Sequence, residues 1–508
     1  MFAKFATTAM LGLFLTTPVV FAKGKTEGAT AYKPMDAAPA DNFEAPTTEH
    51  LDKVASWRIK GSASRNISSA SGSMSSEYQA LVQRVNTMKT AQELDTYLET
   101  LEKDLKASKE KPADYVYVAT LLTSLRPLRS IAWRSMGLAG QSVATQQKIM
   151  DTLRSAYTKS TVLPVENWDL FVDFVSQPLP GATQKFTQES ELQKYIATEV
   201  YNGVAASYNR LSTVDFGKIP GNSIVWDQQL NFGSTSFPDQ LDRYREITPV
   251  EHALLLARMN KLMYRIATFS AYSAKDAIKI EREIKLRYGV EAGASWLHLV
   301  KSDGLTRQEK VNIIQQKKYA QSQTLNAAGK MWMGRAYQHL KGYVDYYETA
   351  YKLSKNSSRS QASFVDVEFV KLHDRELSLM VKNMKALVYG DNRETGESVV
   401  QSSITGETAR VNVKNFFANP PQDLKTLLPT SFDQGPKEIK AEVDGKNLSY
   451  PNLRNGQAQA WSTQAYSNLF PELKNDSQGT KVLQKAKVIS GVRGGDSVLG
   501  QFIHPFVK

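Results

Sequence analysis

Apolar residues recur every three or four positions along most of the chain between residues 77 and 389. The clearest series is Leu255, Met259, Leu262, Ile266 and Phe269. This spacing places apolar side chains on one face of an α-helix, from which they can pack into a core. The sequence therefore predicts helices over 77–89, 93–109, 114–136, 143–159, 164–175, 188–211, 249–288, 306–354 and 363–388.

Local signals mark where several of these helices begin or break. Three Thr/Glu pairs match the capping box, in which the two side chains accept hydrogen bonds from free backbone N–H groups: Thr90 and Glu93, Thr248 and Glu251, Thr306 and Glu309. Pro249 occupies the first helical position after Thr248, where a missing N–H costs nothing. Pro127 is expected to kink or split the 114–136 helix. Gly329, Gly334 and Gly342 predict that 306–354 forms two helices or one bent helix.

The pattern changes after about residue 390. Alternating apolar residues flank Asp444-Gly445, and Asp-Gly between alternating runs is typical of a β-hairpin. Val411, Val413 and Val488-Ile489 are also predicted as strand, and 457–470 as helix. The predicted fold is mainly α: a multi-helix bundle or irregular α-solenoid over 77–389, followed by a small α+β domain over 390–508.

The first 22 residues have the layout of a cleaved secretory signal. Lys4 precedes an apolar stretch that ends in Val20-Phe21-Ala22, so cleavage is predicted after Ala22; a retained membrane anchor is the alternative. The chain has no cysteine, which excludes an N-terminal lipid anchor and disulfide-linked partners. We expect a bacterial protein of the periplasm or the exterior. Residues 23–76, with eight serines between 62 and 76, are predicted to form a flexible tether on which Leu51, Val54 and Trp57 dock locally.

The formal net charge is +12, and the predicted cleavage removes only Lys4. Such an excess favours anionic partners: lipid headgroups, lipopolysaccharide, or peptidoglycan and its attached polymers. Nucleic acid is not an expected partner. The candidate binding residues are Arg126, Arg129, Trp133, Arg134, Lys481, Lys485, Lys487 and Arg493. The alternative is that these charges simply lie on solvated faces.

Gln188-Glu189-Ser190, together with Tyr201-Asn202-Gly203 and Tyr208-Asn209, resembles the motifs of soluble lytic transglycosylases. That resemblance implies that Glu189 is a general acid and base that cleaves cell-wall glycan. The Gly-Leu-Met-Gln type segment of that family is absent. The alternative is that Glu189 and Glu191 lie in a first helical turn and complement the helix dipole.

No other motif predicts chemistry. His373 and Glu376 are the nearest approach to a metal pair, and two ligands are too few for a tight zinc site, so no metal or cofactor is expected. Trp332, Tyr343, Tyr347 and Tyr351 are spaced as a core seam of a helix, although exposed aromatics could stack on sugars. The sequence thus predicts a non-enzymatic envelope protein that binds or scaffolds anionic components or partner proteins, with a glycan-cleaving enzyme as the alternative.

Overall fold

The computed structural model describes residues 33–57, 74–107, 110–139, 168–227, 230, 243–280, 283, 307–356, 365, 367–392, 395–436, 438–443, 446–451, 457–475 and 479–492. Its contacts form two compact units. Unit 1 comprises Met1–Ala31, Pro39–Ala267 and Gln338–Ser378, and unit 2 comprises Tyr32–Ala38, Thr268–Tyr337 and Leu379–Lys508. The fold is mainly α with small two-stranded sheets, as predicted. The proposed domain boundary at residue 390 stays a prediction.

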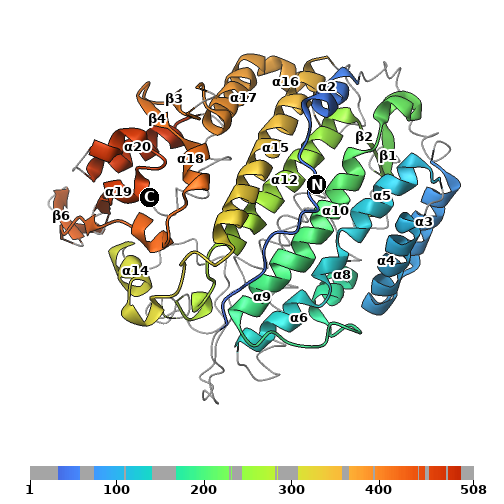
Figure 1. Ribbon diagram of the computed structural model, residues 1–508, viewed down its shortest axis with the longest axis horizontal. Helices are drawn as coiled ribbons and strands as arrows, with labels where there is room; N and C mark the ends of the chain where they lie inside the picture. The colour runs from blue at the N-terminus through green and yellow to red at the C-terminus, as the bar shows by residue number, and fades with distance from the viewer. Residues whose placement is uncertain are drawn as a thin grey trace. The chain divides into compact units, whose positions relative to one another are not determined.

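Unit 1 is built almost entirely from helices (Figure 1). Its elements are α2 (Thr48–Ser56), α3 (Ser76–Thr87), α4 (Ala91–Lys106), α5 (Ala113–Thr123), η2 (Arg126–Leu128), α6 (Ile131–Ser135), η3 (Met136–Ala139), α8 (Trp168–Ser176), α9 (Glu189–Tyr195), the π-helical turn η4 (Ile196–Val200), α10 (Tyr201–Ser212), η5 (Phe216–Lys218), η6 (Pro220–Asn222), β1 (Ile224–Asp227), β2 (Tyr244–Ile247) and α16 (Val367–Leu372). It also holds most of α12 (Pro249–Ala271) and α15 (Gly329–Lys355) and the start of α17 (Asp374–Tyr389). β1 and β2 pair antiparallel, with Ile224 opposite Ile247.

Within unit 1, α10, α12 and α15 lie side by side (Figure 1). Two buried polar contacts join α10 to α15. The Tyr201 hydroxyl lies 2.7 Å from His339 Nε2, and the hydroxyls of Tyr208 and Tyr346 lie 3.2 Å apart. On each helix the two residues are seven positions apart, which returns them to the same face. Hydrogen-bonded polar groups are the form in which polarity is tolerated in a core, so these contacts fix how the two helices face each other.

The segment 39–57 packs onto this core. Phe43 lies with its ring centroid 4.1 Å from that of His339, and Val54 and Trp57 are buried. The Asn209 side chain donates to the Asn42 carbonyl at 2.5 Å and accepts from the Glu44 N–H at 3.3 Å. The docking predicted for Val54 and Trp57 is therefore confirmed. The tether predicted over 23–76 missed the packing of residues 39–53, which offer little apolar periodicity.

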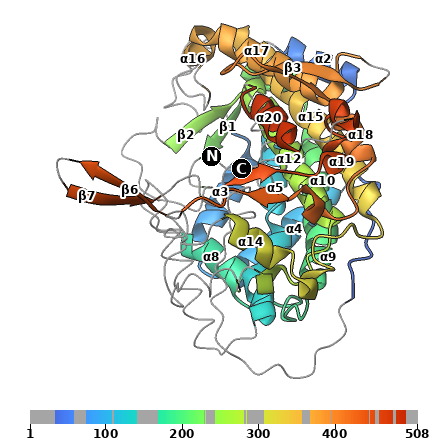
Figure 2. The ribbon, with the colours of Figure 1, turned by 90° about the vertical axis from the view of Figure 1, so that its left-hand side faces the viewer.

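Unit 2 combines short helices with three two-stranded sheets among its described residues. Its elements are α14 (Arg307–Ile314), η9 (Lys317–Tyr319), β3 (Ser398–Gln401), β4 (Thr408–Val411), α18 (Val413–Ala418), η10 (Leu424–Leu427), β5 (Ser431–Phe432), β6 (Glu438–Val443), β7 (Lys446–Pro451), β8 (Ala458–Ala460), α19 (Thr463–Tyr466), η11 (Pro471–Asn475) and α20 (Thr480–Ser490). β3 pairs with β4, β5 with β8 and β6 with β7, all antiparallel. The β6–β7 hairpin extends away from the rest of unit 2 (Figure 2).

Several local predictions are confirmed. Thr90 and Glu93 form a complete capping box at the start of α4. The Glu251 carboxylate accepts from the Thr248 N–H at 2.9 Å, and the Thr248 hydroxyl accepts from the Val250 N–H, so this pair also caps α12. Pro127 lies in η2 between α5 and α6, where the 114–136 helix was predicted to break. The hairpin around Asp444-Gly445 is β6–β7, although the two turn residues lie outside the described residues.

Other predictions are wrong. α12 ends at Ala271 instead of continuing toward Tyr288, because Asn326 Nδ2 donates to the Ser270 carbonyl and Asp276 takes a positive φ. Residues 458–460 form strand β8 rather than helix. Val413 begins α18 and Val488-Ile489 lies inside α20, where burial outweighs the strand preference of β-branched residues.

The 306–354 segment forms two α-helices, which is one of the two arrangements predicted for it. The break precedes Gly329, whose Cβ position would lie 2.6 Å from the Ala271 carbonyl oxygen, while Gly334 and Gly342 lie within α15. The predicted aromatic seam is confirmed at Trp332 and Tyr343, which are buried.

Some predictions fall outside the described residues: the signal peptide and its cleavage after Ala22, the serines at 62–73, the 143–159 helix and the Thr306 cap. Among the helices that the structure does describe, none has both the length and the apolarity that crossing a bilayer requires.

Candidate functional site

Three cations line one face of α12 in unit 1. Arg258, Lys261 and Arg265 are spaced by three and four residues, which brings their side chains onto neighbouring turns of the same face. Arg258 is exposed, and Lys261 and Arg265 are half-buried. Like charges at this spacing repel by about 0.2–0.5 kcal/mol per pair on a helix surface, so the arrangement costs stability unless an anion is present.

Two tyrosines of α15 lie against these cations. The Lys261 ammonium sits 5.3 Å from the centroid of the Tyr343 ring, within the range of a cation–π contact. The Tyr343 and Tyr347 rings are 6.1 Å apart. Burial raises the pKa of the Tyr347 hydroxyl, and the charge of Arg258 partly opposes that rise. The cluster therefore offers charge and aromatic surface together, and we call these five residues the α12/α15 cation cluster.

Burial and mutual repulsion set the electrostatics of the cluster. Burial first, and then the charges of Arg265 and Arg258, lower the pKa of Lys261 to about 8. Burial also lowers the pKa of Arg265. Among the residues that the structure describes, no carboxylate lies within ion-pair distance of Arg258 or Lys261. A bound anion would relieve both penalties, because it favours the charged form of each side chain.

A close helix contact holds the cluster in place. A Cβ at Gly342 of α15 would lie 2.5 Å from the Asn260 side chain of α12, so only glycine lets the two helices approach this closely. Asn260 is fully buried and donates to the Leu256 carbonyl within α12 at 3.0 Å. The tyrosines and cations are thus presented by two rigid helices rather than by loops.

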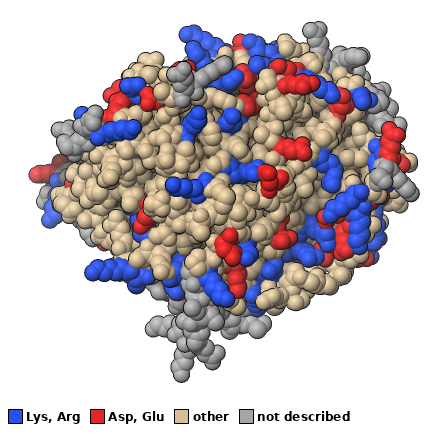
Figure 3. Space-filling view, viewed as in Figure 1, with Lys and Arg blue, Asp and Glu red and all other residues tan. Residues whose placement is uncertain are grey.

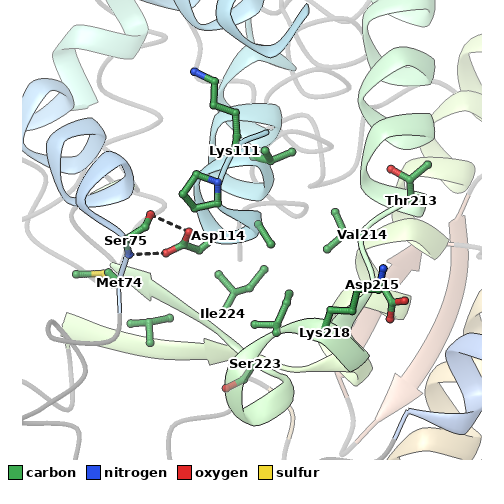
Figure 4. A pocket seen from close by; sticks show the side chains of 15 residues that line it. Met74, Ser75, Lys111, Asp114, Thr213, Val214, Asp215, Lys218, Ser223 and Ile224 are labelled. Atoms are coloured by element: carbon green, nitrogen blue, oxygen red, sulfur yellow. Dashed lines mark hydrogen bonds between the residues drawn. The ribbon is translucent and has the colours of Figure 1, made fainter. Parts of the chain in front are cut away.

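Unit 1 also contains a pocket of about 640 Å³, lined by residues near the start of α3 and α5, the end of α10, η5 and β1 (Figure 4). Ser75 and Asp114 face each other on one side of it, and the Ser75 N–H and hydroxyl both donate to the Asp114 carboxylate at 2.8 Å. Thr213, Val214 and Asp215 form the opposite side. No histidine or cysteine is among the lining residues.

The predicted cations of unit 1 are paired with other protein groups. Arg126 forms ion pairs with Glu99 and Glu102 of α4, and Arg129 lies 3.5 Å from Asp95. These contacts attach η2 to α4. These ion pairs explain the positions of Arg126 and Arg129 without a ligand. The role of both arginines in binding stays a prediction.

Trp133 and Arg134 pack against the segment before α9. The Trp133 indole donates to the Thr183 carbonyl, and Arg134 lies over the rings of Phe186 and Tyr195 at 4.2 and 4.4 Å. Both residues therefore hold α6 against this segment while staying partly exposed, and their role in binding stays a prediction.

The predicted basic residues of unit 2 lie on α20. Lys485 pairs with Glu472 at 2.6 Å, whereas Lys481 and Lys487 are exposed. Arg493 lies outside the described residues.

Glu189 lies in the first turn of α9, half-buried, and does not line the pocket of unit 1. The Tyr-Asn dipeptides that suggested a glycan-cleaving motif make packing contacts within unit 1. Tyr201 and Tyr208 join α10 to α15, and Asn202 and Asn209 hold the N-terminal segment, with Asn42 Nδ2 donating to Asn202 at 3.2 Å. A catalytic role of Glu189 stays a prediction.

His373 Nδ1 lies 3.6 Å from Glu376, a contact on a partly exposed helix end. The described residues contain no group of three or more potential metal ligands. Whether the protein uses a metal therefore stays a prediction.

The α12/α15 cation cluster was missed at the level of sequence. Its spacing of Arg258, Lys261 and Arg265 is visible beside the apolar series of the same helix. What the sequence lacks is any sign that Tyr343 and Tyr347, about 80 residues later, lie against it.

Comparison with known proteins adds nothing to this picture: no protein family matches the sequence, and neither a curated protein nor a solved structure is similar enough to be matched.

Proposed function

We propose that this chain is an exported, non-enzymatic protein of the bacterial envelope that binds an anionic envelope polymer through the α12/α15 cation cluster. The observation that carries the proposal is the pair Arg258 and Lys261, two cations without a carboxylate partner among the described residues and set against tyrosine rings. A signal-like N-terminus supports export.

A polymer fits the cluster better than a flat lipid surface. Lys261 and Arg265 are half-buried beside α15, so an approaching anion must enter between side chains of two helices. A carboxylate or phosphate projecting from a flexible chain can do so, whereas a headgroup in a bilayer plane is held at the surface. The half-buried ring of Tyr347 also provides aromatic surface against which a sugar can pack.

The test is the binding of an acidic polysaccharide, polygalacturonate, to the full chain and to an Arg258→Gln/Lys261→Gln variant. Loss of two charge-assisted contacts should weaken binding by roughly 100-fold or more, since each contributes about 1.5 kcal/mol or above. The matched control is Lys89→Gln/Lys371→Gln, which removes two exposed charges elsewhere in unit 1.

Neutral dextran and phosphatidylglycerol vesicles complete the set of ligands. Equal binding of dextran, or equal loss in the control variant, would remove the proposed site. Tighter binding of vesicles than of polygalacturonate would replace the polymer by a membrane.

A further inference from the structure

We infer that the pocket of unit 1 binds a small amphiphile with an apolar body and a head group that donates hydrogen bonds, a hydroxyl or an ammonium. The inference is independent of the α12/α15 cation cluster, because none of the residues of that cluster lines the pocket.

The size and lining of the pocket suit an apolar body. About 640 Å³ is within the range of roughly 300–1,000 Å³ that small-molecule sites occupy. Val116, Val214, Ile219 and Ile224 are among the apolar residues that line it, and Ile224 lies between its two polar sides in Figure 4. An alkyl chain placed there removes apolar surface from water on both partners.

The hydroxyls of the pocket have used their protons. Ser75 Oγ donates to Asp114 at 2.8 Å, Thr213 Oγ1 to the Arg210 carbonyl at 2.8 Å, and Ser223 Oγ to Glu246 at 3.3 Å. A hydroxyl has one proton and two lone pairs, so these oxygens can offer a ligand only acceptor sites. The ligand must then supply the donors.

The charged residues that line the pocket also favour a ligand that donates hydrogen bonds. Lys111 turns its ammonium away from the centre of the pocket and pairs with Asp104 at 2.5 Å (Figure 4). The pKa of Asp215 is lowered by its hydrogen bond from Lys53, by the Gly217 N–H and by the charges of Lys53 and Lys218, so Asp215 stays ionised. Lys218 also lines the pocket, on the side of Asp215, and its charge acts on that carboxylate. The pocket therefore presents the carboxylates of Asp114 and Asp215, with Lys111 turned away and Lys218 beside Asp215.

The walls of the pocket are fixed before a ligand arrives. The two hydrogen bonds from Ser75 to Asp114 attach the start of α3 to the first turn of α5. Asp215 caps η5 through the Gly217 N–H at 3.0 Å, which holds the opposite side. Binding then needs little ordering of the protein, and preorganisation of this kind preserves affinity.

The experiment compares three probes with one alkyl chain and different heads: 1-octanol, octylamine and octanoate, titrated calorimetrically into the full chain. Octanol and octylamine should bind at least about 10-fold more tightly than octanoate, which brings only acceptors to a pocket of acceptors. Octanoate binding as tightly as either, or no binding of any probe, would overturn the inference.

A Thr213→Lys variant tests the site itself. Thr213 is exposed at the rim, so the change is compatible with folding, and its ammonium would satisfy the acceptors that await the ligand. Binding of octylamine should fall by at least about 10-fold. Thr100→Lys, on the exposed face of α4, is the matched control and should leave it unchanged. An equal loss in both variants, or none in Thr213→Lys, would contradict the assignment of the pocket.

Discussion

Buried and half-buried titratable side chains concentrate in unit 1, and each has a physical cause for its altered pKa. Burial, and to a lesser degree the charge of His50, lowers the pKa of His252 to about 3. This imidazole is enclosed by rings, with Phe216 at 4.9 Å and Tyr117 donating or accepting at 3.2 Å. The pKa of Lys261 is lowered to about 8 by burial and by its cationic neighbours. Burial therefore disfavours the charged form of both groups.

Binding of an acidic polymer should weaken as pH rises through about 8, the pKa of Lys261. Below that value the side chain is an ammonium and attracts the anion; above it the charge is lost. Polygalacturonate affinity measured from about pH 6 to pH 9 should show this decline in the parent protein. In Lys261→Gln the decline should be absent, and its persistence there would assign the titration to another group.

The stability of the fold should rise between about pH 3 and pH 6.5 and then level. In the unfolded chain His252 has an ordinary pKa of about 6.5, so the unfolded state binds the proton throughout this range while the folded state does not. One such group contributes a slope of up to about 1.4 kcal/mol per pH unit. Urea unfolding at several pH values between about 3 and 6.5 measures this change in the free energy of unfolding. His252→Phe should reduce the slope, whereas His373→Gln, at a partly exposed site, should not.

Among the elements, α15 shows how one helix can need glycine at one position and merely tolerate it at another. A Cβ at Gly342 would collide with Asn260 at 2.5 Å, whereas a Cβ at Gly334 would meet nothing within 4 Å. The two positions lie eight residues apart in the same helix. Their different surroundings make them a matched pair for mutation.

Gly334→Ala should therefore stabilise the protein by about 0.5–1 kcal/mol, since alanine restricts the unfolded chain and favours the helix. Gly342→Ala should destabilise it by about 1–3 kcal/mol, because Asn260 must shift in a packed core. Both changes can be followed by urea unfolding. The same sign for both variants would contradict the assigned contact.

The segment 39–57 is a second element whose attachment can be tested. Asn202→Ala/Asn209→Ala removes the side chains that bond to Asn42 and Glu44. Hydrogen exchange in α2 should then rise by roughly 10-fold or more, because a loosely held segment opens more often. Asn312→Ala, at an exposed site of α14, is the control. Unchanged exchange in α2 would show that Phe43, Val54 and Trp57 hold the segment without these amides.

The helix and strand boundaries that the sequence predicted correctly depended on local signals. The Thr90–Glu93 box and Pro127 act within four residues, so they marked helix boundaries correctly. Val488-Ile489 failed because burial against other parts of unit 2, not strand preference, decides its structure. The pocket and the α12/α15 cation cluster each join segments that are distant in sequence, and spacing along one helix cannot show what lies opposite it.

For the molecule as a whole, the positive charge is unevenly divided. Unit 2 contains 29 Lys and Arg against 19 Asp and Glu, whereas unit 1 contains 34 against 32. On the face seen in Figure 3, cations and anions are interspersed rather than gathered into one patch. The excess in unit 2 therefore acts as a general long-range attraction, and the α12/α15 cation cluster of unit 1 as a local contact.

The long-range attraction by unit 2 and the local contact at the α12/α15 cation cluster should depend differently on salt concentration. Replacing five exposed lysines of unit 2 by glutamine, at Lys330, Lys382, Lys414, Lys474 and Lys487, should slow association with polygalacturonate several-fold at about 20 mM salt and have little effect at about 500 mM. Arg258→Gln/Lys261→Gln should weaken binding at both salt concentrations, because Lys261 is half-buried and its contact with the anion is screened less. Stopped-flow association at both ionic strengths decides between them, and a salt-independent effect of the unit 2 lysines would contradict long-range steering.

The contact between Phe43 and His339 has a consequence for how the polypeptide matures. Synthesis begins at the N-terminus, so Phe43 must wait for about two thirds of the chain to be made before its neighbour exists. Contacts between such remote segments close slowly during folding. A nascent chain that ends before residue 339 therefore cannot yet bury Phe43 against this imidazole.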